Sequence, residues 1–455
     1  MRTILFFLLL SLSSPTFAAD FTWKTFLEQK EGYSWQLEKK EERSGYSVHL
    51  LRLRSQTWKT AAEVDRPLWE HELRITIPHT VRHTTALVHV QGGAIDKPLH
   101  SSHHSLAESA VKSGTIFAEL SLIPVQPLLF SSEKKPRTED AIIAYSWRKF
   151  LETKDASWPL HLPMAKAITR AMDSVQEYCR DQKIVQPISF VLLGESKRAW
   201  AAWLTASSDA RVSGLVPVSC DFLNVKAVFT HQYQSLGSWS VAIRDYLAEG
   251  IDEKALRHPA FDELMQLEDP YAYRTSYTMP KYLIQAAGDP FSSPDASRFY
   301  FADLPSPKYL RYLPNVGHKL PSSDVFDAAS TFTLSLLEKK PLPQLTWKRQ
   351  SDGHLEVATD TLPLKVVVWR ATNPDARDFR YDFTKVRWQS EAVAVQSQGV
   401  YNVAPATVEK GWAAFFVEYT YSNPVSGSGA EPLIFTTEVI ITPDVLPFSL
   451  PASVK

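Results

Sequence analysis

One serine in the middle of the chain stands in a pattern that would present its hydroxyl to a substrate. Residues 194–199 read Gly-Glu-Ser-Lys-Arg-Ala, after an apolar run (188–193) and before a helix-like stretch (199–204). A buried strand, a sharp turn with serine at its apex and a helix form a nucleophile elbow. On such a turn the weakly nucleophilic hydroxyl meets a general base and a substrate carbonyl together. The sequence therefore predicts that Ser196 is a catalytic nucleophile.

Later strand ends supply the two partners that such a serine needs. Asp289 follows one apolar run, and His318 follows the next run along the chain. The order serine, acid, histidine is the order of this kind of triad. We expect His318 to act as the general base and Asp289 to orient it. Two other carboxylates stay open: Asp221, which follows an earlier strand, and Asp295, which is also placed to cap a helix.

A serine nucleophile also needs amides that stabilise the negative oxygen of the reaction intermediate. The amide of Lys197 lies at the start of the helix behind the serine, where the helix dipole favours negative charge. A second amide is expected from the loop after the early strand 86–91, which begins with two glycines. Glycine lets a backbone amide face a substrate without a side chain in the way. The predicted oxyanion hole is therefore the amides of Lys197 and Gly93.

The neighbouring polar groups suggest no cofactor. The side chains of Lys197 and Arg198 could bind an anionic group of the substrate, or pair with carboxylates such as Asp221, and we favour pairing. The segment His100–His104 holds three histidines, and imidazole is a common zinc ligand. Because no acidic residue or cysteine stands at ligand spacing there, we expect a solvated loop and no metal. Phosphate-loop, dinucleotide and haem-attachment motifs are absent from the sequence.

The elements that would position these residues divide the chain of 455 residues into two parts. Alternating strands up to about residue 80 lead into near-continuous apolar strands that alternate with helical stretches up to about 335. This pattern is typical of an α/β class domain with a doubly covered, mostly parallel sheet, predicted over 19–340. Within it, the aromatic, mainly helical stretch 222–280 is expected to form a cap over the site, or to pack without touching the substrate.

A second domain is predicted over 341–455. A charged, proline-marked boundary at 339–343 precedes it, and helical periodicity then disappears. Strands are expected at 345–349, 364–369, 412–421 and 433–442, separated by turn residues. Such a pattern favours a small antiparallel β-sandwich of the immunoglobulin or fibronectin type. We expect this domain to support the first or to bind a protein partner, and we place no catalytic residue in it.

Motifs spread over roughly residues 45–325 are shared with one protein family. They include the elbow and the segments Trp69–His71, Glu139–Tyr145, Asp221–Asn224 and Gly288–Phe291. On these motifs the chain resembles the PhoPQ-activated pathogenicity-related protein family, which includes autocrine proliferation repressor relatives. The resemblance implies an α/β-hydrolase fold for the first domain. Relatives usually have glycine where this chain has Ala199, which affects the tightness of the elbow but leaves the nucleophile in place.

The amino-terminal segment 1–18 predicts a secretory signal peptide. A basic residue, Arg2, precedes an apolar run over 4–12, and small residues stand before a cut after Ala18. The run is shorter than the roughly 20 apolar residues that a membrane span needs, and no later segment is long enough, so we expect no stable membrane insertion. A net charge of −1 gives no electrostatic attraction to nucleic acid. The protein is therefore expected to be secreted or periplasmic.

Export permits disulfides, but the chain has only two cysteines, Cys179 and Cys220. Cys179 ends a helix that runs antiparallel to the strands, so it should lie at the amino edge of the sheet. Cys220 ends a strand and should lie at the carboxyl edge. Opposite edges are about 17–20 Å apart, whereas a disulfide allows about 7 Å between α-carbons. We expect two free, buried thiols.

Together these features predict an exported serine hydrolase that cleaves an ester or an amide in a small molecule or peptide. Ser196 would attack the carbonyl, His318 would move the proton and Asp289 would hold the imidazole. The alternative is a secreted signalling or binding protein without catalysis, built on the same scaffold. In that case the cap and the carboxyl-terminal β-domain would form the interaction surface.

Overall fold

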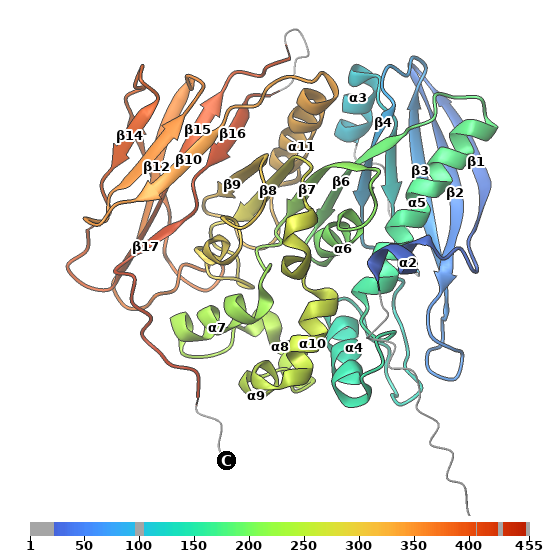
Figure 1. Cartoon of the computed structure of the whole chain (residues 1–455), viewed down its shortest axis with the longest axis horizontal. Helices are drawn as coiled ribbons and strands as arrows, with labels where there is room; N and C mark the ends of the chain where they lie inside the picture. The colour runs from blue at the N-terminus through green and yellow to red at the C-terminus, as the bar shows by residue number, and fades with distance from the viewer. Residues whose placement is uncertain (1–21, 96–103, 406, 426–430, 452–455) are drawn as a thin grey trace, which may run out of the picture.

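The computed structural model describes residues 22–95, 104–405, 407–425 and 431–451. At its centre lies a nine-stranded mixed sheet with the strand order β1-β2-β3-β5-β4-β6-β7-β8-β9 (Figure 1). Its strands are β1 (Ser34–Arg43), β2 (Tyr46–Thr57), β3 (Leu68–Pro78), β4 (Thr85–Val90), β5 (Phe117–Leu120), β6 (Ser189–Glu195), β7 (Val212–Val218), β8 (Lys281–Ala286) and β9 (Lys308–Leu313). The predicted signal peptide lies outside the described residues.

The sheet is antiparallel at its amino-terminal side and parallel from β5 onward. The parallel strands are buried on both faces, as their near-continuous apolar runs predict. Successive side chains of β6 point to opposite faces: Phe190 and Leu192 join one hydrophobic core, and Val191 and Leu193 join the other. Because the strands are parallel, the loops after β4, β6, β7, β8 and β9 meet at one edge of the sheet.

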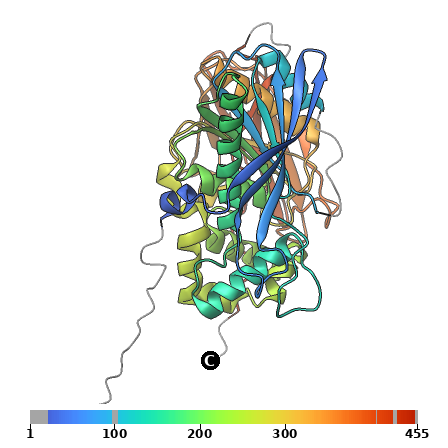
Figure 2. The ribbon, with the colours of Figure 1, turned by 90° about the vertical axis from the view of Figure 1, so that its right-hand side faces the viewer.

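Helices cover both faces, as the sequence predicts. On one face lie α2 (Trp23–Glu28), α5 (His161–Asp181) and α6 (Lys197–Ala206); on the other lie α3 (His104–Ser113) and α11 (Ser322–Leu337). Figure 2 shows α5, in green, on one side of the blue strands β1 and β2. His161 belongs to the first turn of α5.

A layer of helices lies beyond the carboxyl ends of the parallel strands (Figure 1). It contains α7 (Val225–Leu236), η1 (Val241–Ile243), α8 (Arg244–Ala248), α9 (Glu253–Arg257), α10 (Pro259–Glu268) and η2 (Pro270–Ser276), and it is joined by α4 (Asp140–Thr153). The ring of Trp147 in α4 packs against Tyr246 of α8 and Phe261 of α10, with centroids 5.1 and 6.0 Å apart. The helical cap therefore includes α4, which comes from outside the stretch 222–280.

The carboxyl-terminal part forms two antiparallel sheets beside β9 and α11 (Figure 1). One contains β10 (Leu345–Arg349), β11 (Leu355–Thr359) and β14 (Val400–Val403); the other contains β12 (Lys365–Asn373), β13 (Gln389–Val393), β15 (Trp412–Tyr421), β16 (Leu433–Thr436) and β17 (Ile440–Thr442). The stretch 433–442, expected to form one strand, forms the two short strands β16 and β17. The strands β11, β13 and β14 fall in stretches that were expected to be connections. They are short, and β13 is almost wholly exposed. Because none of them has a long apolar run, the sequence pattern does not predict them.

The two cysteines are free and buried, which confirms that prediction. Burial raises the pKa of the Cys179 thiol to about 12 and that of Cys220 well above its usual value. None of the helices in the described residues has both the length and the hydropathy of a membrane span.

Candidate active site

The sharp turn expected around Ser196 is present. Ser196 lies between the end of β6 and the start of α6 with its φ in the positive region, a backbone conformation that non-glycine residues rarely adopt. Its amide donates to the carbonyl of Val218 in the neighbouring strand (2.8 Å). A Cβ on Gly194 would lie 2.8 Å from the carbonyl carbon of Arg198 and 2.9 Å from the amide of Ala199. The turn is therefore tight because residue 194 is glycine, and the fully buried Ala199 fits behind it.

A chain of two hydrogen bonds joins Ser196, His318 and Asp289. The Ser196 hydroxyl is 2.9 Å from His318 Nε2, and His318 Nδ1 is 2.7 Å from Asp289 Oδ2. We assign Ser196 Oγ–H and His318 Nδ1–H as the donors, since the buried carboxylate can only accept when ionised. The other oxygen of Asp289 accepts from the amide of Phe291 (2.8 Å), which fixes the carboxylate after β8.

The electrostatics around His318 favour the protonated imidazole. Burial lowers its pKa, but the charge of Asp289 and the hydrogen bond to it raise the pKa more, so the net shift is upward from 6.5. The ammonium of Lys197 opposes this shift. The ring of Phe291 lies 4.4 Å from the imidazole, centroid to centroid, and shields one side of it from water. This arrangement stabilises an imidazolium formed when a serine proton is taken up.

The alternative acid, Asp221, lies apart from the histidine. Its oxygens accept hydrogen bonds from the hydroxyls of Tyr300 (2.6 Å) and Tyr312 (2.7 Å). Burial raises the pKa of Asp221 to about 7, although these hydroxyls lower it. The alternative that Asp221 orients His318 is wrong, because its carboxylate accepts from two tyrosines and Asp289, the residue expected in this role, lies beside Nδ1.

Asp295 does not cap the short helix η3 (Ala296–Phe299) that follows it. It instead lies 3.0 Å from Nε2 of His231 in α7 and accepts from Nη2 of Arg377 (2.6 Å). Both Asp295 and Arg377 are buried, and the pKa of Asp295 falls well below its usual value because these bonds outweigh the effect of burial. Asp295 therefore joins α7 to the carboxyl-terminal part through His231 and Arg377 and does not cap a helix.

The cations that follow the serine are paired, as the sequence analysis favours, but with different carboxylates. Lys197 Nζ lies 2.9 Å from Glu139 Oε2 and 3.2 Å from Asp140 Oδ1, and Arg198 Nη2 lies 2.7 Å from Glu139 Oε1. Burial raises the pKa of Glu139, but the two cations lower it more, to about 2. The pairing with Asp221 is therefore wrong, because the start of α4 brings two carboxylates closer.

Both predicted oxyanion amides lie at the carboxyl edge of the sheet. Lys197 is the first residue of α6, and the pairing of Val90 with Gly194 places Gly93 on the loop beside the elbow. The carbonyl of Gly93 accepts from the side chain of Gln126 (2.7 Å), which fixes the orientation of this segment. Among the described residues, neither amide has a hydrogen-bond acceptor. Their role in binding an oxyanion stays a prediction.

A loop of the carboxyl-terminal part holds the segments that carry Asp289 and His318. We call residues 374–388, between β12 and β13, the clamp loop. The amide of Tyr381 donates to the carbonyl of Gly288 (3.0 Å), and a Cβ on Gly317 would collide with the carboxylate of Asp382. A Cβ on Gly288 would lie only 2.7 Å from that of Tyr381, so glycine is required directly before Asp289.

Two further contacts fix the clamp loop. Its residue Arg377 reaches Asp295 and also donates to Ser235 Oγ in α7 (2.8 Å). At its other end, Trp388 exchanges hydrogen bonds with Asn315, which shortly precedes His318. The sequence does not predict this loop, because its residues follow no strand or helix period and its contacts join positions far apart along the chain.

A small cavity adjoins Ser196. Its volume, measured as the space open to the centre of a water-sized sphere, is about 20 Å³. It is lined by Asp140, His161, Ser196, Lys197, Trp200, Phe222, Phe229, Tyr246 and Phe291. Phe229 and Tyr246 come from the cap, so the cap contacts the space beside the nucleophile. Of the other lining residues, Asp140 falls in the motif Glu139–Tyr145 shared with the family, whereas His161 belongs to no motif or pattern that would predict a role for it.

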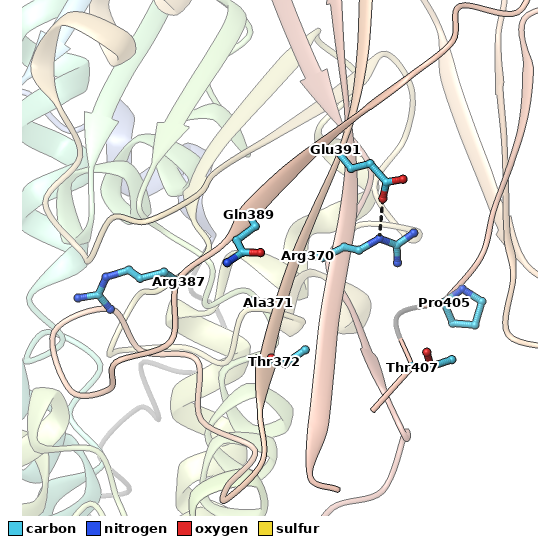
Figure 3. A pocket seen from close by; sticks show the side chains of 8 residues that line it. All are labelled: Arg370, Ala371, Thr372, Arg387, Gln389, Glu391, Pro405 and Thr407. Carbon is cyan, nitrogen blue, oxygen red and sulfur yellow. Dashed lines mark ion pairs between the residues drawn. The ribbon is translucent and has the colours of Figure 1, made fainter. Parts of the chain in front are cut away.

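A larger and open hollow, of about 490 Å³, lies on the carboxyl-terminal sheets. Figure 3 shows its lining: Arg370, Ala371, Thr372, Arg387, Gln389, Glu391, Pro405 and Thr407. None of the predicted catalytic residues lies in it. In the described part of the chain no cluster of three or more histidine, cysteine or acidic side chains could hold a metal ion. The side chains of the segment His100–His104 lie outside that part.

Comparison with solved structures supports the architecture. Acetyl xylan esterase 1 from Thermoanaerobacterium sp. JW/SL YS485 has a TM-score of 0.50 to this chain at 14% identity, over 69% of this chain and 92% of the esterase. Acetyl xylan esterase from Paenibacillus sp. R4 has a TM-score of 0.50 at 11% identity, again over 69% of this chain and 92% of the other. At such identities the likeness concerns the fold, and it shows an α/β-hydrolase fold.

Sequence comparison places the chain more closely. Autocrine proliferation repressor protein A of Dictyostelium discoideum is 34% identical over 474 aligned residues, which cover 98% of this chain and 95% of that protein. Residues 24–380 match the family of the PhoPQ-activated pathogenicity-related proteins. This match spans the sheet, the cap, every residue of the Ser196–His318–Asp289 chain and the first part of the clamp loop. The resemblance found in the motifs is thereby confirmed: the chain belongs to the PhoPQ-activated pathogenicity-related protein family.

Proposed function

We propose that the protein is a serine hydrolase that cleaves an ester or an amide. The observation that carries this proposal is the continuous hydrogen-bond chain from Ser196 Oγ through His318 to Asp289. A buried turn serine without a catalytic role would not need a strained backbone and a histidine–carboxylate pair within hydrogen-bond distance. The α/β-hydrolase fold supports the same conclusion, since it presents this serine at the edge of the sheet where ligands bind.

In the proposed reaction, Ser196 Oγ attacks the substrate carbonyl while its proton moves to His318 Nε2. The charge of Asp289 stabilises the imidazolium and keeps the remaining proton on Nδ1. The amides of Lys197 and Gly93 bind the oxyanion, and each such donor is worth about 10²–10³ in rate. His318 then protonates the leaving group, and water, activated by the same histidine, releases the acyl group from Ser196.

Esters are the favoured substrates. The structural neighbours reported above are named for acetyl xylan, an ester, and the cavity beside Ser196 has room only for a short acyl chain. We further propose that the protein is exported, because the amino-terminal segment 1–18 has the composition of a signal peptide.

The test is hydrolysis of aryl acetates by the purified protein. We expect Ser196→Ala to lose at least about 10³-fold in kcat/KM. The matched control is Ser213→Ala, since this serine lies near the start of β7, towards the opposite edge of the sheet. Equal activity in wild type and Ser196→Ala would refute the proposal.

A second candidate function is binding of a protein partner without catalysis. The open hollow on the carboxyl-terminal sheets favours it, because two arginines and Glu391 line a polar recess there, with Arg370 and Glu391 3.5 Å apart (Figure 3). This candidate takes first place if a folded protein lacks all esterase and amidase activity. Gln389→Glu would then weaken binding of the partner and leave folding unchanged, because Gln389 lines the hollow from an exposed position of β13.

A further inference from the structure

The cavity beside Ser196 contains a histidine that the proposed reaction does not use. His161, in the first turn of α5, is fully buried and lines the cavity. Its ring stacks on Trp200 at 4.5 Å between centroids, with 14° between the planes. Its Nδ1 lies 3.1 Å from Oε1 of Glu268, a carboxylate that is itself fully buried. Within the described residues, neither ring nitrogen has a partner that meets hydrogen-bond geometry, so Nδ1 has the carboxylate nearby and Nε2 has no acceptor or donor.

This environment decides which hydrogen bond Nε2 can make. The nearby carboxylate favours a proton on Nδ1, which leaves Nε2 as the ring nitrogen able to accept a hydrogen bond. Glu268 is held in place because Oε1 also accepts from the amide of His161 (2.9 Å) and Oε2 accepts from the indole of Trp147. A buried acceptor without a donor is costly, and a ligand that brings a donor removes that cost.

The position of the cavity indicates which half of the substrate it receives. The leaving group must be near His318 Nε2, which protonates it. The cavity is lined by Lys197 and Trp200 of α6 and by Phe291, whose ring packs on the imidazole, whereas His318 itself is not among its lining residues. The group that enters it is therefore the acyl chain. The cavity is little larger than the space that one water molecule needs, which limits the chain to one or two atoms beyond the carbonyl.

The charges around the cavity favour a neutral donor over an ammonium group. Asp140, the acidic residue of the lining, already has the ammonium of Lys197 at 3.2 Å, and this cation would repel a second one. The rest of the wall is aromatic: Trp200, Phe222, Phe229, Tyr246 and Phe291. A hydroxyl can donate to His161 while its carbon contacts the rings.

We propose that this cavity is an acyl subsite for short 2-hydroxyacyl groups and that His161 accepts a hydrogen bond from their hydroxyl. The inference rests on the proposed serine hydrolase function and adds the substrate class. His161 thereby determines specificity, whereas the attack itself needs only Ser196 and its partners.

The test compares two esters of one aryl alcohol that differ in a single group: the hydroxyacetyl ester and the propionyl ester, in which a methyl replaces the hydroxyl. We expect wild type to favour the hydroxyacetyl ester by about 10- to 100-fold in kcat/KM, after correction for their rates in buffer. The aminoacetyl ester should be a poor substrate, and a pentanoyl ester should be poorer than the propionyl ester. A ratio near one in wild type would overturn the proposal.

Variants assign the preference to His161. His161→Phe keeps a ring against Trp200 but has no acceptor, so the ratio should fall towards one while fluorophosphonate labelling of Ser196 persists. His161→Gln returns an acceptor oxygen and should restore part of the preference, which also covers the case in which the phenylalanine variant does not fold. The control is His49→Phe. His49 is a buried histidine of β2 that is hydrogen-bonded to Tyr178 of α5, and β2 is far from the elbow strand β6 in the sheet order. This variant should keep the ratio of wild type.

The outcomes separate the two levels of the account. If the fluorophosphonate labels Ser196 but both variants keep the preference of wild type, the proposed role of His161 is wrong and the hydrolase proposal stands. If wild type is not labelled and hydrolyses neither ester, the hydrolase proposal fails and this inference fails with it.

Discussion

Asn315 and Trp388 exchange two hydrogen bonds across the junction between the hydrolase sheet and the carboxyl-terminal sheets. Asn315 Nδ2 donates to the carbonyl of Trp388 (2.9 Å), and the amide of Trp388 donates to Asn315 Oδ1 (2.8 Å). Asn315 has a positive φ and lies in the turn that leads from β9 to His318. The carboxyl-terminal part therefore helps to set the position of the proposed general base.

The first prediction concerns this pair. Asn315→Gly tolerates the positive φ but loses both bonds, each worth about 1 kcal/mol. We expect kcat to fall roughly tenfold with little change in KM, because His318 is held less firmly relative to Ser196. Asn315→Asp keeps the acceptor alone and should be intermediate. Asn402→Ala, an exposed position of β14, is the control; equal kinetics for Asn315→Gly and this control would contradict the role of the clamp loop.

The second prediction concerns the elbow. A Cβ on Gly194 would meet the backbone of Arg198 at 2.8 Å, so Gly194→Ala must shift the start of α6 and the serine with it. We expect the rate of fluorophosphonate labelling to fall at least about tenfold, as a misplacement of this kind does. Ala199→Gly is the matched variant: it should keep the labelling rate and cost about 0.5–1 kcal/mol in urea unfolding, because glycine is a poorer helix residue. Equal labelling of the two variants would contradict this account of the turn.

The third prediction concerns pH. The base must be neutral to accept the serine proton, and the pKa of His318 is raised above 6.5 by Asp289 despite burial. The acid limb of kcat/KM should therefore have its midpoint above pH 6.5. Asp289→Asn removes the charge that raises the pKa, so the limb should move to lower pH while activity falls about 10³–10⁴-fold. A limb that stays in place in this variant would mean that Asp289 does not act on His318.

The raised pKa also affects stability. The folded state holds the His318 proton more tightly than the unfolded state, so this group contributes stability below about pH 6.5. That contribution is lost as the pH rises through the folded pKa.

The fourth prediction concerns the buried carboxyl of Asp221. Burial raises its pKa to about 7, whereas the unfolded chain titrates near about 3.9. The folded state therefore binds this proton more tightly, and the free energy of unfolding should fall between about pH 4 and 7. Over two pH units of this range, the free energy of unfolding should fall by on the order of 2–3 kcal/mol. Asp221→Asn has no such proton to lose. In urea unfolding, the difference in free energy of unfolding between wild type and this variant should therefore shrink from about pH 5 to about pH 8.

The control for this pH series is Asp375→Asn, since its side chain is 82% exposed. It should follow wild type at every pH. A constant difference between wild type and Asp221→Asn across the range would show that Asp221 does not hold its proton.

The sequence predicts the strand ends well, and with them the three residues that the structure brings together. Buried parallel strands are continuous apolar runs, and the functional side chains follow directly after them, so Ser196 and His318 are marked by local pattern alone. The two free cysteines follow from the same placement of strand and helix ends.

Long-range partners are not marked in this way. Both Asp221 and Asp289 follow a strand, so the local pattern does not distinguish them. The difference is that the hydroxyls of Tyr300 and Tyr312 donate to the carboxylate of Asp221. Glu139 attracts the cations of the elbow from a distant part of the chain through the fold of α4, not through spacing. The clamp loop lies in a polar stretch without period, and only packing of the second part on the first gives it a role.

The most direct measurement of the central claim is the mass of the intact protein after treatment with a fluorophosphonate. We expect one adduct on wild type, formed faster as the pH rises through the pKa of His318, and none on Ser196→Ala. A folded wild-type protein that forms no adduct, or an adduct that persists in Ser196→Ala, would contradict the claim that Ser196 is an activated nucleophile.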